Sequence, residues 1–375
     1  MEAWWRDLRF SLRALARQPS FTLAAVSTMA LGIGASAAIF SMFDGVLLRP
    51  LPYEDAERIA VVWQTDVERG MREGKLSTAN FIDLRDGGTF DRLAAAEAYG
   101  FDLIGGGSPE RIRAWLVTAG FFELLGTTPY RGRMPSTTEQ AGDQHVVVLG
   151  HGLWQRRFGA DPAIIGTSIV LSGTPHVVIG IMPPEFRMPA AADMWLPRSF
   201  TDEERQARRR THLNVVGRLK PGTSLEQTRA EVDVVANRLA DRFPDINGSL
   251  GLAVVALPDQ LFAELRPALG VVLGAVGFLL LLACANVANL TLLRGFHRRR
   301  ELASRAALGA TRGELIRLLV TESLIVALAG AAAGLVLAFV GIRVFQTTAP
   351  AELPRLAEIA VDVRVLVFML AAVVF

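Results

Sequence analysis

Long uncharged apolar runs alternate with one long segment of mixed polarity along the chain. The three longest such runs lie at residues 20–43, 268–293 and 323–342. Each is about 20 residues or longer, which is enough for a helix to cross a hydrocarbon core of roughly 30 Å. A further apolar run, 365–375, is too short to span. We therefore predict three complete transmembrane helices and the start of a truncated fourth.

The first apolar run has an alternative interpretation as a cleaved signal peptide. It starts far from the N-terminus, is long, and is followed by no clear small-residue cleavage site before the polar segment. An uncleaved transmembrane anchor is therefore the favoured prediction. The truncated last run adds the expectation that the chain is a fragment, or one half of a longer protein.

Residues 1–18 carry two kinds of side chain at helical spacing. Trp4, Trp5, Leu8, Leu12 and Leu15 share one face, and the arginines of this segment fall mostly on another. Such a pattern is typical of an amphipathic helix in the membrane interface, anchored by tryptophans. The plainer alternative is a basic helical N-terminus that does not enter the interface.

The segment 44–267 alternates strand-like and helical patterns. The strand-like runs are rich in valine and isoleucine, and they are 58–64, 112–118, 145–149, 168–171, 176–181, 212–219 and 252–257. The helical stretches are 78–86, 119–125 and 224–242. Two β-α-β units are predicted, one built around helix 78–86 and one around helix 224–242. With the strand-rich region 100–210 between them, they predict a large two-lobed α+β domain.

Helix 224–242 carries its own start signal. Thr223 is the predicted N-cap, because Glu226 three residues later completes a capping box. Leu225, Val232, Val235 and Leu239 then form one apolar face.

Composition and charge set the topology. Hydrophobic residues make up 51% and charged residues 20%, and the mean hydropathy is +0.33, a mixture that requires apolar spans beside a water-facing domain. Arginines concentrate in residues 1–18 and in the loop 294–322, which places both in the cytoplasm. The domain 44–267 is then extracytoplasmic, and 343–364 is an outer loop. The arginine excess reflects composition bias, so no nucleic-acid partner is expected.

Candidate chemistry is sparse. No catalytic, cofactor-binding or metal-binding constellation is predicted: the histidines are dispersed, and Asp102, Asp143 and Glu185 are expected to be solvated. Cys284 lies inside the second span and has no partner for a disulfide. Gly32 and Gly34 resemble a dinucleotide turn, but close helix packing explains them better. Asn286 and Asn289 are expected to hydrogen-bond to a neighbouring helix.

The loop 294–322, named here the coupling loop, has the features of two short helices joined by a tight turn. Glu301 and Arg305 form an i,i+4 pair, and Gly309 is placed to end the first helix. Thr311 is the predicted cap of the second, with Glu314 three residues on. That second helix continues into the third span, so a partner docked on the loop would act directly on the membrane helices.

The coupling loop resembles the cytoplasmic motif of MacB/FtsX-type ABC transporter permeases. The residues that match this motif are Glu301, Arg305, Ala307, Leu308, Gly309, Ala310 and Arg312, followed by Glu322 and Ser323. Residues 17–53 resemble the first span of a duplicated permease subfamily common in acidobacteria. The segments 121–133 and 146–189 are similar to the extracytoplasmic domain of that subfamily.

The resemblance implies a permease subunit of the bacterial inner membrane that has no nucleotide chemistry of its own. A separate cytoplasmic ABC ATPase would dock on the seven motif residues, and its closure would be relayed to the extracytoplasmic domain. Further partners implied are the lipid bilayer, a second permease half or an identical copy, and a periplasmic adaptor. In the subfamily a full chain carries two four-span halves, and this chain matches the first.

Three functions compete. The first is a permease for export. The second is an FtsX-like regulator that relays ATPase motion to an extracytoplasmic enzyme. The third, a two-span sensor, predicts a signalling domain after the second span, whereas the chain re-enters the membrane after the coupling loop. A secondary transporter is disfavoured because the three complete spans lack ionisable residues.

Overall fold

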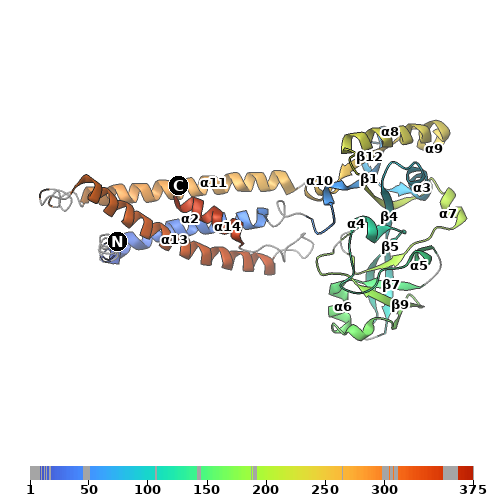
Figure 1. The fold of residues 1–375 in the computed structure, drawn as a ribbon, viewed down its shortest axis with the longest axis horizontal. Coiled ribbons are helices and arrows are strands. Elements are labelled where there is room, and N and C mark those ends of the chain that lie inside the picture. The colour runs from blue at the N-terminus through green and yellow to red at the C-terminus, as the bar shows by residue number, and fades with distance from the viewer. Residues whose placement is uncertain are drawn as a thin grey trace. The chain divides into compact units, whose positions relative to one another are not determined.

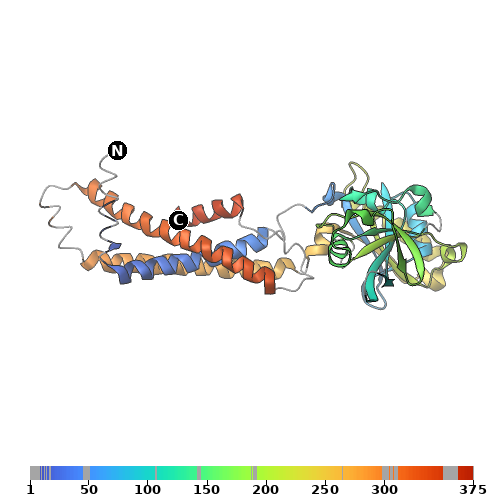
Figure 2. The same ribbon diagram turned by 90° about the horizontal axis from the view of Figure 1, so that it is seen from below.

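The structure, a computed structural model, divides the chain into two units (Figures 1 and 2). The residues it describes are 18–44, 51–105, 108–141, 145–186, 192–263, 265–297, 311–348 and 362–374, with the single residues 9, 11, 13, 15, 16, 188, 304 and 307. The helical unit is built from Met1–Arg49 and Glu264–Phe375, and the α+β unit is Pro50–Ala263.

The helical unit contains three helices long and apolar enough to cross a membrane, as the sequence predicts. Its described helices are α2 (Pro19–Phe43), α11 (Leu265–His297), α13 (Arg312–Thr348) and the shorter α14 (Val363–Val374). Helix α2 packs against the other three (Figure 1). Their shared core includes Met29, Ile33 and Ala37 of α2 and Val365 of α14.

Helix α13 is longer than the apolar run that predicts it. It begins at Arg312, directly after the predicted cap Thr311, and continues without a break to Thr348. The first six residues of the predicted outer loop 343–364 are therefore helical. The position of the membrane boundary along this helix stays a prediction.

The N-terminal segment is helical at its described residues 9, 11, 13, 15 and 16. Arg9 and Arg13 are exposed, whereas Leu15 packs against Ala25 and Val326. The apolar position Leu15 therefore contacts protein, and the polar residue Ser11 is buried as well. Whether this helix lies in the membrane interface stays a prediction.

The α+β unit is organised around one twelve-stranded sheet. Its strands are β1 (Ile59–Asp66), β2 (Met71–Gly74), β3 (Leu76–Ser77), β4 (Arg92–Ile104), β5 (Glu110–Val117), β6 (Arg131–Gly132), β7 (Val146–Leu149), β8 (Ser168–Leu171), β9 (Thr174–Ile181), β10 (Met194–Pro197), β11 (Thr211–Arg218) and β12 (Leu250–Ala256). Its described α-helices are α3 (Thr78–Asp86), α4 (Phe121–Leu125), α5 (Thr137–Ala141), α6 (His151–Phe158), α7 (Asp202–Gln206), α8 (Leu225–Arg242), α9 (Pro244–Asn247) and α10 (Leu257–Phe262).

The first lobe interleaves the two predicted β-α-β units. Its strand order is β12-β1-β11-β4, and each neighbouring pair is antiparallel. Strands β1 and β4 are joined through α3 and are therefore parallel, with β11 between them. Strands β11 and β12 are joined through α8 and are likewise parallel, with β1 between them. This is the split β-α-β arrangement. Phe81 of α3 and Val232 of α8 cover the same face of this sheet.

The second lobe is a small closed barrel. Strand β4 pairs with β5, β5 with β10, β10 with β7, β7 with β9, β9 with β8, and β8 again with β4. Side chains from all six strands fill its interior, among them Leu103, Ile112, Val147, Leu171, Val178 and Met194. Closure removes exposed sheet edges, which explains how such short strands form a stable lobe.

A third core joins the two lobes. Along β7, Val147 and Leu149 point into the barrel, while Val146 and Val148 belong to this second face. There they meet Phe122 of α4 and Val216 of β11. The free face of the first lobe is thus covered by the outside of the barrel, and strand β4 runs through both lobes.

Helix α8 begins one residue later than predicted. Ser224, not Thr223, is the N-cap: its Oγ accepts from the backbone N–H of Gln227 at 3.2 Å, and Gln227 Oε1 accepts from the Ser224 N–H at 2.9 Å. Thr223 instead completes the preceding turn, where its N–H donates to the carbonyl of Lys220. Both residue pairs fit the capping-box pattern, and the turn at Gly222, with φ of 77°, selects the later one.

Candidate coupling site

Two of the seven motif residues of the coupling loop lie among the described residues. Ala307 is helical with an exposed side chain, and Arg312 is the first residue of α13 and is also exposed. The other five, Glu301, Arg305, Leu308, Gly309 and Ala310, lie outside the described residues. The described part of the motif therefore presents its side chains to the surroundings and not to the helical core.

The beginning of α13 combines exposed and buried polar residues. Thr321 and Glu322 are each only 5% exposed, although they lie at the start of the apolar stretch. The hydroxyl of Thr321 donates to the carbonyl of Arg317 one turn earlier, at 2.8 Å. Four residues further on, Val326 contacts Leu15 of the N-terminal segment. The end of α13 nearest the motif is thus packed into the helical unit.

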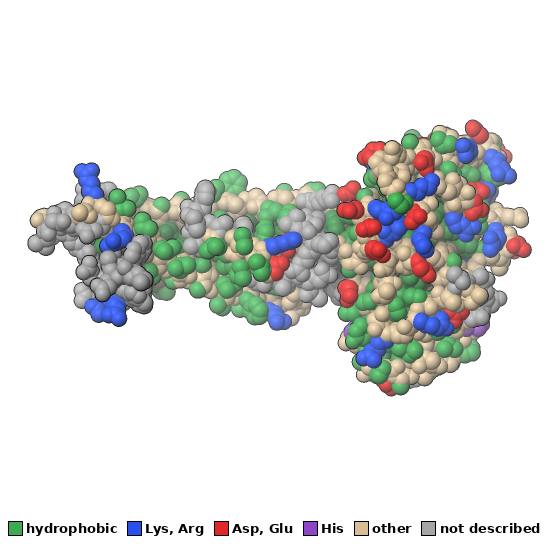
Figure 3. Space-filling view, in the orientation of Figure 1, with side chains coloured by type: hydrophobic (Ala, Val, Ile, Leu, Met, Phe, Trp, Pro, Cys, Tyr) green, Lys and Arg blue, Asp and Glu red, His purple; other side chains and the backbone are tan. Residues whose placement is uncertain are grey.

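Side chains on the surface of the helical unit are largely apolar on the face that Figure 3 shows, and its charged residues gather toward the ends of the helices. Phe278 and Val271 of α11 are more than 70% exposed. Asn286 and Asn289 are exposed on the same helix. A helix outside this helical unit would have to provide the hydrogen bonds predicted for these two amides.

The glycines of α2 mark close helix packing, as the sequence predicts. A Cβ atom at Gly34 would lie 2.8 Å from the carbonyl oxygen of Gly334, and one at Gly32 would lie 2.7 Å from the Cβ of Ala283. Both distances are shorter than real Cβ atoms tolerate. The glycine pair is therefore a contact with α13 and α11, not a dinucleotide turn.

Glu97 of β4 is a buried carboxylate that was not predicted from the sequence. Its oxygens lie 3.4 Å from Arg198 Nε, 3.5 Å from Arg210 Nη2 and 3.8 Å from His212 Nε2. Arg198 also binds Glu204 at 2.6 Å. These residues come from both lobes and from the segment that connects them. The arginine-rich run 205–210 is a sequence signal compatible with acidic partners, and Arg210 is its member that contacts Glu97.

Glu139 forms the tightest described ion pair of the barrel lobe. Arg133 donates to it through both Nη atoms, at 2.6 and 2.7 Å, and Ser136 adds its N–H and hydroxyl at 2.8 Å. The Arg133 bond lowers the pKa of Glu139 to about 2, against the opposing effect of burial and with help from Ser136. This carboxylate serves structure, because each described contact is within the lobe.

Other candidate groups show no shared site. Asp102 pairs with Arg111 at 3.3 Å on the surface, Glu185 is exposed, and Asp143 lies outside the described residues. The rings of His145 and His176 meet edge to face, with their centres 4.9 Å apart. Burial lowers the pKa of His176, and the neighbouring His145 adds to that lowering while the Thr174 carbonyl opposes it. Within the described ranges, no group of three or more His, Cys, Asp or Glu residues could hold a metal ion.

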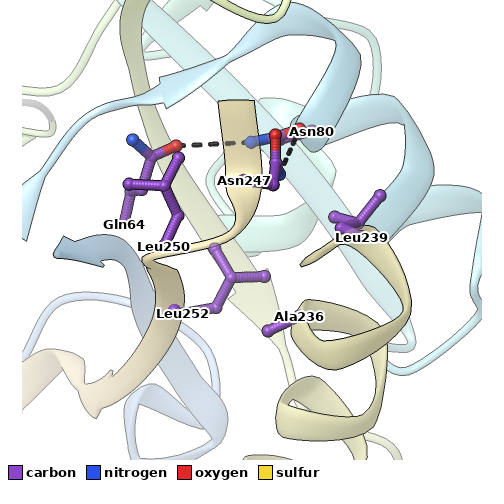
Figure 4. A pocket seen from close by; sticks show the side chains of 8 residues that line it. Gln64, Asn80, Ala236, Leu239, Asn247, Leu250 and Leu252 are labelled. Atoms are coloured by element: carbon purple, nitrogen blue, oxygen red, sulfur yellow. Dashed lines mark hydrogen bonds between the residues drawn. The ribbon is translucent and has the colours of Figure 1, made fainter. Parts of the chain in front are cut away.

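A small pocket lies in the first lobe between α8, α9, β1 and β12 (Figure 4). Its polar wall is a chain of amides: Asn80 donates to Gln64 at 3.3 Å, and Asn247 donates to Asn80 at 3.2 Å. Leu239, Leu250 and Leu252 form the apolar wall. Arg208 extends this hydrogen-bond network, because its guanidinium donates to both Asn80 and Asp83. The network ties α9 to α3, so the pocket is part of the packing of this lobe.

Two family models match the chain. Residues 22–235 match the MacB-like periplasmic core domain, and residues 273–375 match the FtsX-like permease C-terminal domain. Together with the α+β unit and the apolar helices, they define a membrane permease of the MacB/FtsX type of ABC transporter. The chain belongs to the MacB-like periplasmic core domain family, whose model covers more than half of it.

The curated relatives named here share about a quarter of the aligned residues with this chain. The macrolide export ATP-binding/permease protein MacB of Burkholderia thailandensis is 24% identical over 226 residues, which are 58% of this chain and 33% of that protein. The pyoverdine export ATP-binding/permease protein PvdT of Pseudomonas syringae pv. tomato is 24% identical over 214 residues, 54% of this chain and 31% of that protein. The chain spans about a third of the length of these relatives.

Among solved structures, the periplasmic region of MacB from Actinobacillus actinomycetemcomitans matches 61% of this chain and 97% of that structure, with 12% identity and a TM-score of 0.42.

Proposed function

We propose that this permease couples a separate cytoplasmic ABC ATPase to its α+β unit and thereby drives export. ATP binding closes the ATPase, the coupling loop passes the motion to α13, and the helical unit passes it on. Substrate need not cross through the helices in this scheme. Export is supported by the names of the relatives, two of which are described as exporting a macrolide and pyoverdine.

The observation that carries the proposal is the continuity of α13. This helix begins at the motif residue Arg312 and runs unbroken into an apolar stretch long enough to span a membrane. A rigid helix that starts at a charged, exposed motif transmits displacement along its axis without a hinge. Arg312 and Ala307 are exposed, as a docking surface requires.

The same proposal sets topology and partners. Arginines of residues 1–18 and of the coupling loop face the cytoplasm of a bacterial cell, and the α+β unit lies outside the inner membrane. Besides the lipid bilayer, the partners are the ATPase, a second permease half or an identical copy, and a periplasmic adaptor. The subfamily resemblance favours a duplicated permease with two four-span halves, of which this chain is the first.

The match to an FtsX-like permease domain supports a second candidate. In that alternative the same helical unit relays ATPase motion to an extracytoplasmic enzyme and nothing is exported. Both candidates use the coupling loop in the same way. A periplasmic adaptor that copurifies with the chain would favour export, whereas a copurifying wall hydrolase would favour the relay.

Charge reversal at Glu301 or Arg305, and Gly309→Val, test the coupling loop. We expect each variant to insert into the membrane normally but to lose copurification of the ATPase and stimulation of its turnover. The matched control is Arg238→Glu, an exposed charge reversal on α8 of the α+β unit. Docking and turnover that stay at the wild-type level in all three loop variants would refute the assignment of this loop.

A further inference from the structure

Helix α2 has the most buried position of the three long helices. Buried residues make up 44% of its apolar span, compared with 11% for α11 and 28% for α13. The described residues of α2 contact α11, α13 and α14. At its end, Asp44 is 2% exposed and accepts from Arg364 of α14 at 3.0 Å. Helix α2 is therefore the element that the rest of the helical unit packs around.

Chain connectivity limits how α13 can act on the α+β unit. Helix α2 leads into that unit and α11 follows it, whereas α13 is joined to it by neither end in the described chain. Within the described chain, motion that enters at α13 can pass to α2 through side-by-side packing, or return to α11 along the coupling loop. These are the two routes that a test has to distinguish.

The contact between α2 and α13 includes one place where the two backbones meet, beside the packed side chains of both helices. A Cβ atom at Gly34 would lie 2.8 Å from the Gly334 oxygen, and one at Gly334 would lie 3.1 Å from both the Ala30 oxygen and the Gly34 nitrogen. One turn away, a Cβ atom at Gly330 would clash with the Cβ of Met29. Main chains in direct contact have no flexible side chains between them to absorb a displacement.

We propose that α2 is the transmission helix of this permease, and that the contact of Gly34 with Gly334 is the point where displacement of α13 becomes displacement of α2. The inference rests on the proposed function. It adds that α2, not α11, carries the motion to the α+β unit, and it makes Gly34, Gly330 and Gly334 positioning residues.

A pair of glycine variants on one helix tests the contact without any ATPase. Gly334→Ala adds a methyl group against α2, whereas at Gly341, on the same helix, no atom lies within 4 Å of the added Cβ. Both changes alter helix propensity equally. In the full chain in nanodiscs, we expect Gly334→Ala to shift amide exchange upward in α2 and at β1, and Gly341→Ala to leave both unchanged. Gly34→Ala repeats the test from the other helix.

The second arm adds the ATPase that copurifies with the full chain and a non-hydrolysable ATP analogue. In the wild type, nucleotide should change exchange at the start of α13 and in the α+β unit. In Gly334→Ala, we expect the nucleotide-dependent change in exchange at the start of α13 to remain and the change in the α+β unit to be lost. Two results for Gly334→Ala would overturn the inference. One is a shift in amide exchange that stays within α13 when no ATPase is present, and the other is a nucleotide response that persists in the α+β unit. Failure of the proposed function would give a different result. Either no ATPase copurifies with the wild-type chain, or nucleotide does not change amide exchange at the start of α13 in the wild type.

Discussion

The Arg133–Glu139 pair shows how one residue contact sets a pH dependence. The bidentate bond and the two contacts from Ser136 stabilise the ionised carboxylate, and so the pKa of Glu139 is lowered from its usual value of 4.5 to about 2. A carboxyl whose pKa is depressed by folding contributes stability that is complete above the unfolded pKa. That contribution is lost as pH falls from about 4.5 toward 2.

Replacing this carboxyl should remove part of the acid sensitivity. We expect Glu139→Gln to lower the melting temperature of the α+β unit at neutral pH and to flatten its decline below about pH 4.5. Thermal melts of the full chain between about pH 7 and 3 measure both effects. Asp102→Asn is the control, because its pair with Arg111 is exposed and such pairs contribute about 0–1 kcal/mol. An unchanged slope in Glu139→Gln would contradict the prediction.

Glu97 shows what residue-level reading of a sequence misses. Nothing in the residues around β4 marks this glutamate, because its partners Arg198, Arg210 and His212 lie more than a hundred residues away in the chain. Only the return of the chain from the barrel to β11 brings them together. By contrast, the closeness of Gly32 and Gly34 to neighbouring helices was predictable, since small residues inside an apolar span are typical of places where helix backbones meet.

At the scale of elements, local patterns predicted the long helices and the valine-rich strands, because each carries its own period. The short helices α5, α6, α7, α9 and α10 were not predicted. Strand β8 and helix α3 have the predicted bounds, and β9 differs by two residues at its start. Pairing was not predictable in the same way. The interleaving of the two β-α-β units and the closure of β8 onto β4 depend on which distant strands meet, and valine-rich strands fit many neighbours equally well.

The cap of α8 gives a test at this scale. Ser224→Ala should destabilise the α+β unit by about 1 kcal/mol, because it removes the acceptor of the Gln227 N–H. Thr223→Ala should cost less than about 0.5 kcal/mol, since only its backbone N–H bonds in the turn. Urea unfolding of the full chain, followed by tryptophan fluorescence, compares the two. A larger loss of stability in Thr223→Ala than in Ser224→Ala would indicate that Thr223 is the N-cap, as the sequence predicts.

At the scale of the whole molecule, the core shared by the two lobes should make the α+β unit unfold cooperatively. Phe122 is 1% exposed and packs in this shared core, whereas Leu171 is buried inside the barrel. We expect Phe122→Ala to cost roughly 3–5 kcal/mol and to speed amide exchange in both β11 and β7. Leu171→Ala should speed amide exchange first in the barrel strands. Faster exchange in only one lobe of Phe122→Ala would contradict this.

Strand β4 also bears on how such a domain can change over evolutionary time. The barrel, residues 98–197, begins within β4 and ends before β11, and its two junctions are adjacent: Ala96 pairs with Val117, whose carbonyl accepts from the Arg198 N–H at 2.8 Å. Adjacent junctions are typical of a segment that can be exchanged as a cassette. The shared core acts against that, because the outside of the barrel covers the free face of the first lobe. We expect relatives to vary in the barrel loops far from Phe122, and to retain apolar residues where β7 and α4 meet β11.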